Sequence, residues 1–493
     1  MNDLSGYLPE TERANFVAGE WLASAGEARA ILNPADESTI ATVADAGPDE
    51  VAAAVRAAGE ARRPWSLRPA VERGEVLRAF AERIEANGDR LAALLTAEVG
   101  KPIAQAEGEV GFAAAILRYT SEWARRLQGD VVPSDEPDEV INLLRVPVGT
   151  VAAICAWNFP LALFARKVAP ALLAGNAVVA KPSELTPLSA IAATHLAEES
   201  GIPAGVLNLV CGGPETGRAL VRDPGVDMVT MTGSTRAGKQ ILADVAENMT
   251  RVSLELGGKA PAIVLADSDL DLAVEQVLGA RHLNSGQVCT SAEVVYVEEG
   301  IADAFTDRYG RAVAGLKVGD PRQGADVGPL ASSAQLQKVG AAVDAALAAG
   351  ATPVVAGGPL EDRGSGYWYS PVVLGDVTDG MAVAESEVFG PVTPIVAVAS
   401  MEDAIERANA SRYGLSAYLF TNSYQRAMRA SRDLECGEIY INRGIGEALQ
   451  AHHSGHRQSG MGGEDGYYGL LRYTQVRSVY HHFGGGEERS DGV

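Results

Sequence analysis

The feature that most constrains the fold is an alternation of short apolar runs with helical stretches, which begins near residue 148. The apolar runs VAAICAW, AVVAK, VLNLV and DMVTM are separated by segments of helical pattern such as LFARKVAPALLAG and SAIAATHLAEES. Neighbouring parallel strands need a crossover long enough to hold a helix, and such strands are apolar on both faces. The pattern therefore predicts βαβ units and a parallel sheet that is covered by helices.

The same alternation returns after residue 260, in the runs PAIVLA, VVYVEE, PIVAVA, AYLFT and EIYIN. A chain of 493 residues is too long for one small core, so we expect two doubly wound α/β domains. Residues 49–128 are rich in alanine and place Leu and Val at helical spacing, which predicts helices for this segment.

Two segments fit neither domain. Residues 129–147 have the pattern of a hairpin with an acidic, proline-containing turn, and residues 473–483 have the pattern of a late strand. Because neither has an evident partner in its own domain, we expect both to pair between subunits, in a homodimer or homotetramer. The glycine-rich, charged tail at 484–493 is predicted to be disordered.

The charge of the chain argues against several classes of partner. It has 41 basic and 64 acidic side chains, a net charge of −23, which would repel nucleic acid and anionic membrane surfaces. The N-terminal run MNDLSGYLPETER lacks the pattern of a signal peptide, and the most apolar stretch, 147–180, is interrupted by Arg166 and Lys167. Four cysteines without CxxC spacing are typical of a reducing compartment. We therefore expect a cytoplasmic protein.

Two stretches at predicted strand ends have the residues of a nucleotide site, although the GxGxxG fingerprint is absent. In TGSTRAG, Gly233 permits a sharp turn and Ser234 opens a helix whose free N–H groups can hold a phosphate. In AVVAKPSE, Lys181 and Glu184 follow a strand, where a carboxylate can bind ribose hydroxyls. Taken alone, each stretch is better explained without a ligand, the first as a capped helix after a strand and the second as an exposed charge pair in a loop.

Three further stretches contain candidate reactive groups. Asn158 in CAWNFP can donate to an oxyanion, and Glu255 in LELGGK lies among apolar neighbours that would make it a general base. Their structural alternatives are a satisfied core amide and a glutamate at a strand edge facing water. Cys289 in NSGQVC is either a nucleophile or a small buried hydrophobe.

Together these stretches form a specific combination. LELGGK, NSGQVC and EVFGPV occur in this order, alongside CAWNFP, KPSE and TGS. The chain thereby resembles the NAD(P)-dependent aldehyde dehydrogenase superfamily, from NPAD at 33–36 to SGMGGEDG at 459–466.

The resemblance implies an aldehyde dehydrogenase-like α/β fold with a Rossmann-like cofactor domain, a catalytic domain and a small β oligomerisation element. The expected divisions are an NAD-binding domain of 1–128 and 148–254, a catalytic domain of 255–458, and a bridging element of 129–147 and 459–483.

The resemblance also implies roles for the candidate reactive groups. The Cys289 thiolate would attack an aldehyde to form a thiohemiacetal, which expels hydride to a nicotinamide. Glu255 would activate the water that hydrolyses the resulting thioester. Asn158 and the backbone N–H of Cys289 would form the oxyanion hole.

For the cofactor, the resemblance assigns Lys181 and Glu184 to the adenosine ribose. We expect NAD rather than NADP, because a 2′-phosphate would be repelled by Glu184. The other residues that the resemblance implies for the cofactor site are Trp157, Gly233 and Ser234 near the pyrophosphate, Leu256, and Glu387 with Phe389 at the nicotinamide ribose.

The detailed sequence is most similar to the subgroup that oxidises lactaldehyde and glycolaldehyde, in the stretches AWNFPLALFARK and YINRGIGEALQAHHSGHRQSG. In that subgroup an Arg, a Glu and a His line a pocket for a small hydroxylated substrate, and Arg166, Glu447 and His453 match them by position. The cluster HHSGH also raises the possibility of a metal. We expect instead a loop on the solvent side and no metal, because no Cys or carboxylate stands beside it at ligand spacing.

Three alternatives remain at this point. A semialdehyde dehydrogenase acting on succinate semialdehyde or a similar compound would share every motif. A CoA-acylating relative would use CoA in place of water, but such relatives typically lack the base at Glu255. A binding protein without turnover would not need Asn158, Glu255, Cys289 and Glu387 together.

Overall fold

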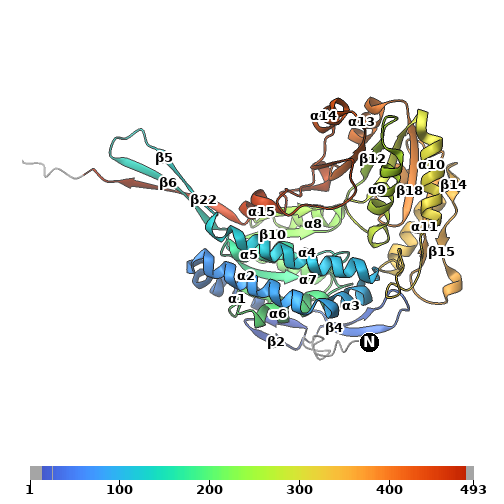
Figure 1. Cartoon of the computed structure of the whole chain (residues 1–493). Coiled ribbons are helices and arrows are strands. Elements are labelled where there is room, and N and C mark those ends of the chain that lie inside the picture. Colours follow the sequence, from blue (N-terminus) through green and yellow to red (C-terminus); the bar gives the residue numbers. More distant parts are fainter. Residues whose placement is uncertain (1–13, 25, 485–493) are drawn as a thin grey trace, which may run out of the picture.

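Two large sheets and a projecting β arm make up the computed structural model, which describes residues 14–24 and 26–484 (Figure 1). The first sheet has eight strands in the order β2-β1-β9-β8-β7-β10-β11-β21. Its central strands, from β9 to β11, are parallel, and the strands at its two edges are antiparallel. The bounds are β1 (Asn15–Val17), β2 (Glu20–Leu22), β7 (Thr150–Ile154), β8 (Ala177–Lys181), β9 (Leu207–Leu209), β10 (Met228–Thr232), β11 (Arg251–Glu255) and β21 (Gly460–Met461).

Alternate residues of the central strands enter two separate cores, because successive side chains of a strand point to opposite faces. Val178 of β8 packs with the first core, whereas Val179 packs with the second. Most of the helical residues of the first core come from α2 (Ala70–Ala86), α3 (Gly88–Val99), α4 (Ile103–Glu122), α5 (Pro160–Leu173) and α6 (Leu188–Glu199). The second core is covered by α1 (Pro48–Leu67), α7 (Pro214–Arg222) and α8 (Thr235–Asp244). The helices predicted for 49–128 are confirmed as α1 to α4.

The second sheet has seven strands in the order β14-β17-β18-β13-β12-β19-β20, parallel except for β14. Helices contribute to the apolar clusters on its two faces, so the predicted α/β fold of two doubly wound sheets is confirmed. The strands are β12 (Ala260–Val264), β13 (Ala292–Glu298), β14 (Thr352–Val355), β17 (Val372–Gly375), β18 (Val392–Val398), β19 (Ser416–Phe420) and β20 (Glu438–Ile441). The helices are α9 (Leu270–His282), α10 (Glu299–Ala314), α11 (Ser333–Ala348), α12 (Ala382–Glu385), α13 (Met401–Ala410) and α14 (Tyr424–Asp433).

The arm consists of β5 (Asp130–Pro133), β6 (Glu139–Pro147) and β22 (Thr474–His482), and it extends away from the two sheets (Figure 1). Strand β22 pairs antiparallel with β6 along its whole length, from Thr474 opposite Pro147 to His482 opposite Glu139. The expectation that these segments lack a partner in their own chain is therefore wrong. The short helix α15 (Gly466–Arg472), which packs against α5, leads the chain back to β6.

The remaining elements are short. A hairpin of β3 (Ala28–Leu32) and β4 (Thr39–Ala44) and a second of β15 (Gly358–Pro359) and β16 (Tyr369–Ser370) complete the strands. Within the predicted bridging segment 459–483, β21 joins the first sheet and only β22 belongs to the arm. We retain the division into domains as a proposal.

Some expectations concern parts of the chain at its two ends. The N-terminal run 1–13 and all of the predicted tail except residue 484 lie outside the described residues. Across residues 14–24 and 26–484, no helix has the length and apolar character needed to cross a lipid bilayer.

Candidate active site

The candidate residues gather where the parallel strands of the first sheet end. Ile154 of β7 lies opposite Lys181 of β8, and Thr232 of β10 lies opposite Glu255 of β11, so these carboxyl ends form one edge. Ligands of open α/β sheets bind at this edge. The loop that contains Cys289 reaches this edge from the second sheet, just before β13. The loop that contains His453 lies between β20 of the second sheet and β21 of the first.

The loops of Cys289 and Asn158 are tied together by hydrogen bonds. Asn158 Nδ2 donates to Gln287 O (3.0 Å), and Asn284 Nδ2 donates back to Asn158 O (3.0 Å). An amide nitrogen carries two hydrogens, so Asn158 retains one for a ligand. The chain turns sharply before Cys289, where Gly286 has φ +77° and an added Cβ would lie 2.5 Å from the carbonyl oxygen of Gly390. No other residue type fits this position without strain.

Asn158 is fixed from behind by a buried ion pair of α4 and the segment before it. Lys101 Nζ donates to Asn158 O (2.8 Å) and contacts Glu109 Oε2 (2.5 Å). Glu109 Oε1 in turn accepts the N–H groups of Leu161 and Ala162 (3.0 and 3.1 Å), in the first turn of α5. The pair therefore holds both Asn158 and the start of the helix that follows it.

Glu255 is buried, with 2% of its surface exposed, and lies between β10 and β21. The alternative of a strand-edge glutamate facing water is therefore wrong. Burial raises the pKa of Glu255 to about 8, and the hydrogen bond from Gly455 N–H to Oε2 (3.1 Å) opposes the rise only in part. Its other oxygen, Oε1, is buried and has no hydrogen-bond partner among the described residues, so its capacity to accept a hydrogen bond is unused.

A buried ion pair of Lys167 and Glu464 lies behind Glu255. Glu464 raises the pKa of the Glu255 carboxyl and Lys167 lowers it, so the pair acts on Glu255 through its charges. Sequence reasoning did not assign either residue. A signal was present, because a lysine in an otherwise apolar helix needs a buried partner.

Arg166, Glu447 and His453 come together beside Cys289. Arg166 Nη2 contacts Glu447 Oε2 (2.5 Å) and Asp465 Oδ2 (2.9 Å). Burial alone would raise the pKa of the Glu447 carboxyl. The charges of Arg166 and His453 have the larger combined effect and lower this pKa to about 2. Burial raises the pKa of the Cys289 thiol, and the neighbouring His453 opposes this rise. The three residues predicted to bind substrate thus form one charged cluster next to the candidate nucleophile.

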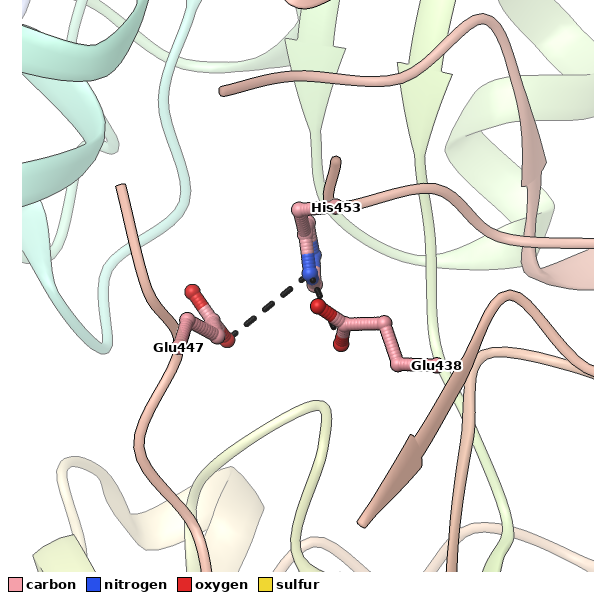
Figure 2. Close-up of side chains that lie close together, drawn as sticks. All are labelled: Glu438, Glu447 and His453. Carbon is pink, nitrogen blue, oxygen red and sulfur yellow. Dashed lines mark hydrogen bonds and ion pairs between the residues drawn. The ribbon is translucent and has the colours of Figure 1, made fainter. Parts of the chain in front are cut away.

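His453 is 3% exposed, so the expected solvent-side position of the HHSGH loop is wrong for this residue, although His456 is exposed. Its Nδ1 lies 3.2 Å from Glu438 Oε2 and 3.8 Å from Glu447 Oε1 (Figure 2). Candidate ligand atoms of these three residues lie within 4.8 Å of one another. Because Glu447 is already paired with Arg166, we interpret the cluster as an ion-pair network, and the absence of a metal stays a prediction.

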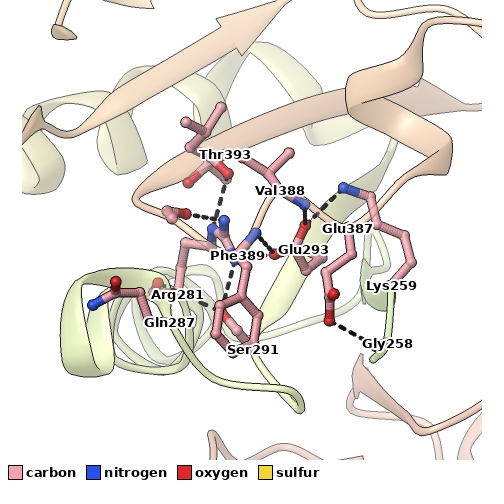
Figure 3. A network of polar contacts seen from close by, with 12 residues as sticks. Gly258, Lys259, Arg281, Gln287, Ser291, Glu293, Glu387, Val388, Phe389 and Thr393 are labelled. Atoms are coloured by element: carbon pink, nitrogen blue, oxygen red, sulfur yellow. Dashed lines mark hydrogen bonds and ion pairs between the residues drawn. The ribbon is translucent and has the colours of Figure 1, made fainter. Parts of the chain in front are cut away.

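Glu387 and Phe389 lie on a loop that a buried network holds in place (Figure 3). Glu293, paired with Lys259 (2.8 Å) and Arg281 (3.1 Å), accepts the N–H groups of residues 388 and 389. Phe389 contacts the ring of Trp157 edge-on, with a centroid distance of 5.4 Å.

The carboxyl group of Glu387 faces the glycines of LELGGK. Its Oε1 accepts the N–H of Gly258 (2.9 Å), and an added Cβ at Gly257 would lie 2.6 Å from its Oε2. Burial raises the pKa of Glu387 to about 7.

At the predicted adenosine end, Lys181 is buried and Glu184 is partly buried. Lys181 is buried, its Nζ donates to Pro182 O (2.9 Å), and burial lowers its pKa, so an exposed charge pair with Glu184 is excluded. Ser234 caps α8, since its Oγ accepts the N–H of Ala237 (3.2 Å). An added Cβ at Gly233 would lie 2.5 Å from the end of the flexible Met231 side chain, which can move aside, and Gly233 is not among the glycines with positive φ. The side chain of Leu256 lies against Gly238 of α8.

Comparisons with known proteins agree with this geometry. The chain is 44% identical to lactaldehyde dehydrogenase of Escherichia coli K12, over 94% of this chain and 98% of that protein. It is 46% identical to 3,6-anhydro-alpha-L-galactose dehydrogenase of Streptomyces coelicolor (97% and 98% covered) and 43% identical to mitochondrial succinate-semialdehyde dehydrogenase of Arabidopsis thaliana (94% and 88%).

Solved structures agree as well. Lactaldehyde dehydrogenase from Escherichia coli superposes with a TM-score of 0.93 at 43% identity, covering 95% of this chain and 99% of that one. For 3,6-anhydro-L-galactose dehydrogenase in complex with NAP the TM-score is 0.92 at 42% identity, with 94% and 99% covered. The profile of the aldehyde dehydrogenase family matches residues 21–479. The chain therefore belongs to the aldehyde dehydrogenase family, whose members are oxidoreductases that oxidise aldehydes, and the resemblance of the motifs is confirmed.

Proposed function

We propose that this enzyme oxidises small, neutral, hydroxylated aldehydes, of the lactaldehyde and glycolaldehyde type, to carboxylic acids with NAD. The observation that carries the proposal is the buried cluster of Arg166, Glu447 and His453 beside Cys289. A pocket with several polar groups favours a substrate that can hydrogen-bond to them, because leaving such a group unpaired costs about 1–3 kcal/mol.

The reaction uses three groups of the chain. Cys289 attacks the aldehyde carbon, and Asn158 with the backbone N–H of Cys289 stabilises the oxyanion of the thiohemiacetal. Glu255, which has an unpartnered oxygen, takes a proton from the water that cleaves the thioester.

The strand ends fit a nicotinamide dinucleotide. Glu387 is a partly buried carboxylate that accepts the N–H of Gly258, and Ser234 caps the start of a helix, where backbone N–H groups can bind phosphate. When bound, the nicotinamide would accept the hydride that leaves the thiohemiacetal. Lys181 and Glu184 would hold the adenosine ribose, and Glu184 supports a preference for NAD over NADP.

Charge argues for a neutral substrate over a semialdehyde that carries a carboxylate. The Arg166 guanidinium is already shared by the carboxylates of Glu447 and Asp465. A substrate carboxylate would therefore meet two negative groups at the cation that should bind it. The CoA-acylating alternative has less support, because such relatives typically lack a glutamate at the position of Glu255.

One assay tests the proposal: NADH formation with lactaldehyde, glycolaldehyde, propanal and succinate semialdehyde, each with and without CoA, and with NADP in place of NAD. We expect the hydroxyaldehydes to exceed propanal about tenfold or more in kcat/KM, which corresponds to one unpaired polar group. A higher kcat/KM for succinate semialdehyde than for the hydroxyaldehydes would contradict the proposed substrate. A dependence on CoA would contradict hydrolysis by water, and equal use of both cofactors would contradict the preference for NAD.

A further inference from the structure

Asp465, which lies against the charged cluster, has a backbone conformation that disfavours aspartate. Its φ and ψ are 60° and 166°, in a region that is adopted almost only by glycine, because a side chain is strained there. In the segment 462–466, the other residues with positive φ are all glycines: Gly462, Gly463 and Gly466. A glycine would fit position 465 with less strain, so the aspartate side chain requires a separate explanation.

The usual reason for an aspartate at such a position does not apply. Asp465 is the N-cap of α15, and an N-cap aspartate normally accepts the backbone N–H of the second or third residue of its helix. The Asp465 side chain makes no such capping hydrogen bond. Its carboxylate is instead buried, with 6% of the side chain exposed, and contacts Arg166 on α5. The side chain therefore serves the cluster rather than its own helix.

The contact between Asp465 and Arg166 is one of charge. Arg166 Nη2 donates a hydrogen bond to Glu447 Oε2, and Asp465 Oδ2 lies 2.9 Å from the same nitrogen. Although this distance is that of an ion pair, Asp465 Oδ2 accepts no hydrogen bond from any described residue, so the contact lacks the direction of a hydrogen bond. Asp465 thus adds a second negative charge to a guanidinium that already has a carboxylate partner in Glu447.

Negative charge is consequently in excess around Arg166. The guanidinium supplies one positive charge, whereas Glu447 and Asp465 supply one negative charge each. The neighbouring titratable groups have separate partners, Lys167 for Glu464 and Glu438 for His453. Without the charge of Asp465, Arg166 and Glu447 would form a balanced pair, and a substrate carboxylate beside them would meet less repulsion.

We propose that Asp465 is a specificity-determining residue whose charge makes the pocket reject aldehydes that bear a carboxylate, which rests on the proposed function in placing Arg166 in the substrate pocket. Discrimination between two substrates depends on the difference between their binding free energies, so a charge that repels one of them is sufficient. The strained backbone agrees with such a role, because strained residues gather at functional sites. Glycine at position 465 would relieve the strain and lose the discrimination.

Steady-state kinetics with a matched pair of aldehydes tests this role. Succinate semialdehyde bears a carboxylate, and its methyl ester has the same carbon chain without the charge. The ratio of kcat/KM for the acid to kcat/KM for the ester is measured for the wild type, Asp465→Asn and Asp465→Gly. Burial raises the pKa of Asp465 to about 6, so the assay is run at about pH 8, where the carboxyl group is ionised.

We expect both variants to raise this ratio about tenfold or more, through a higher kcat/KM for succinate semialdehyde, because one nearby negative charge is removed. Asp271→Asn is the matched control, since it removes an exposed carboxylate that is paired with Arg308. This control should leave the ratio unchanged.

An unchanged ratio in Asp465→Asn overturns the proposal, and so does a ratio that rises only because oxidation of the ester falls. Should Asp465→Asn fail to fold, Asp465→Gly decides by the same criteria, because glycine adopts this backbone without strain. The choice of the wild type between lactaldehyde and succinate semialdehyde tests the proposed function. The change of the ratio between wild type and variants tests Asp465, so the two can fail separately.

Discussion

At Glu255, burial and charge act on one carboxyl group. Burial raises its pKa to about 8, Glu464 adds to the rise, and His453 and Lys167 oppose it. Below this pH the group is mostly protonated and unable to accept a proton from water. The protein therefore sets the pH range in which its proposed base works, through neighbours up to 209 residues away in the chain, such as Glu464.

Deacylation should accordingly rise with pH, about tenfold per unit below pH 8, and level off above it. In Glu255→Gln we expect a stoichiometric burst of NADH followed by a steady state slower by about 10²–10⁴-fold, without the rising limb. Stopped-flow absorbance measures both phases. Glu435→Gln, an exposed glutamate paired with Arg457, is the control. Loss of the burst as well would show that Glu255 acts before acylation.

At the scale of elements, Glu109 of α4, which forms an ion pair with Lys101, links α4 to the start of α5 in addition to their apolar contacts. Lys101 and Glu109 are both fully buried, and together they hold the carbonyl of Asn158 and the first turn of α5. Helix α5 in turn carries Arg166 and Lys167 to the site. The geometry of the candidate active site thus depends on a pair that is not among the candidate reactive groups.

Lys101→Met should lower the free energy of unfolding by about 3–5 kcal/mol, because Glu109 would be left as a lone buried charge. The double variant Lys101→Met/Glu109→Gln should recover part of this loss. Denaturation in urea measures both. Arg83→Met, which removes an exposed pair with Glu199 (3.0 Å), should cost only about 0–1 kcal/mol. Equal losses for the buried and the exposed variants would show that the buried pair does not anchor α5.

At the scale of the whole molecule, the arm leaves apolar surface uncovered. Val131, Val476, Tyr480 and Phe483 are between 52% and 72% exposed, although they lie on or beside paired strands. Apolar surface and open strand edges of this kind are typical of association. A homodimer or homotetramer stays our prediction, now with the assembled arm as the contact rather than two separate strands.

Light scattering at micromolar concentration should give a mass of two or four chains for the wild type. Val131→Asp/Tyr480→Asp should reduce the mass, because charges on the arm would be buried without partners. Asp substitution at Leu242, an exposed leucine on α8 away from the arm, should leave the mass unchanged. A monomeric wild type would refute the prediction.

The alternation of apolar runs was enough to predict two parallel sheets, and motifs at strand ends were enough to place Asn158 and Lys181 near one edge. Both follow from local properties: the residue period of a strand, and the rule that the carboxyl ends of parallel strands meet. Cys289 could be singled out only by the combination of motifs.

Tertiary structure decided which charges meet and which strands pair. Arg166 and Glu447 are 281 residues apart, and no local pattern indicates that Asp465 shares the same guanidinium. The HHSGH loop was expected on the solvent side because no Cys or carboxylate stands beside it at ligand spacing, yet Glu438 and Glu447 make the burial of His453 possible. Strand β22 pairs with β6, and α15 is the element that leads the chain into β22. Partners of buried charges and edge strands depend on packing between distant segments, and sequence periodicity contains no record of that packing.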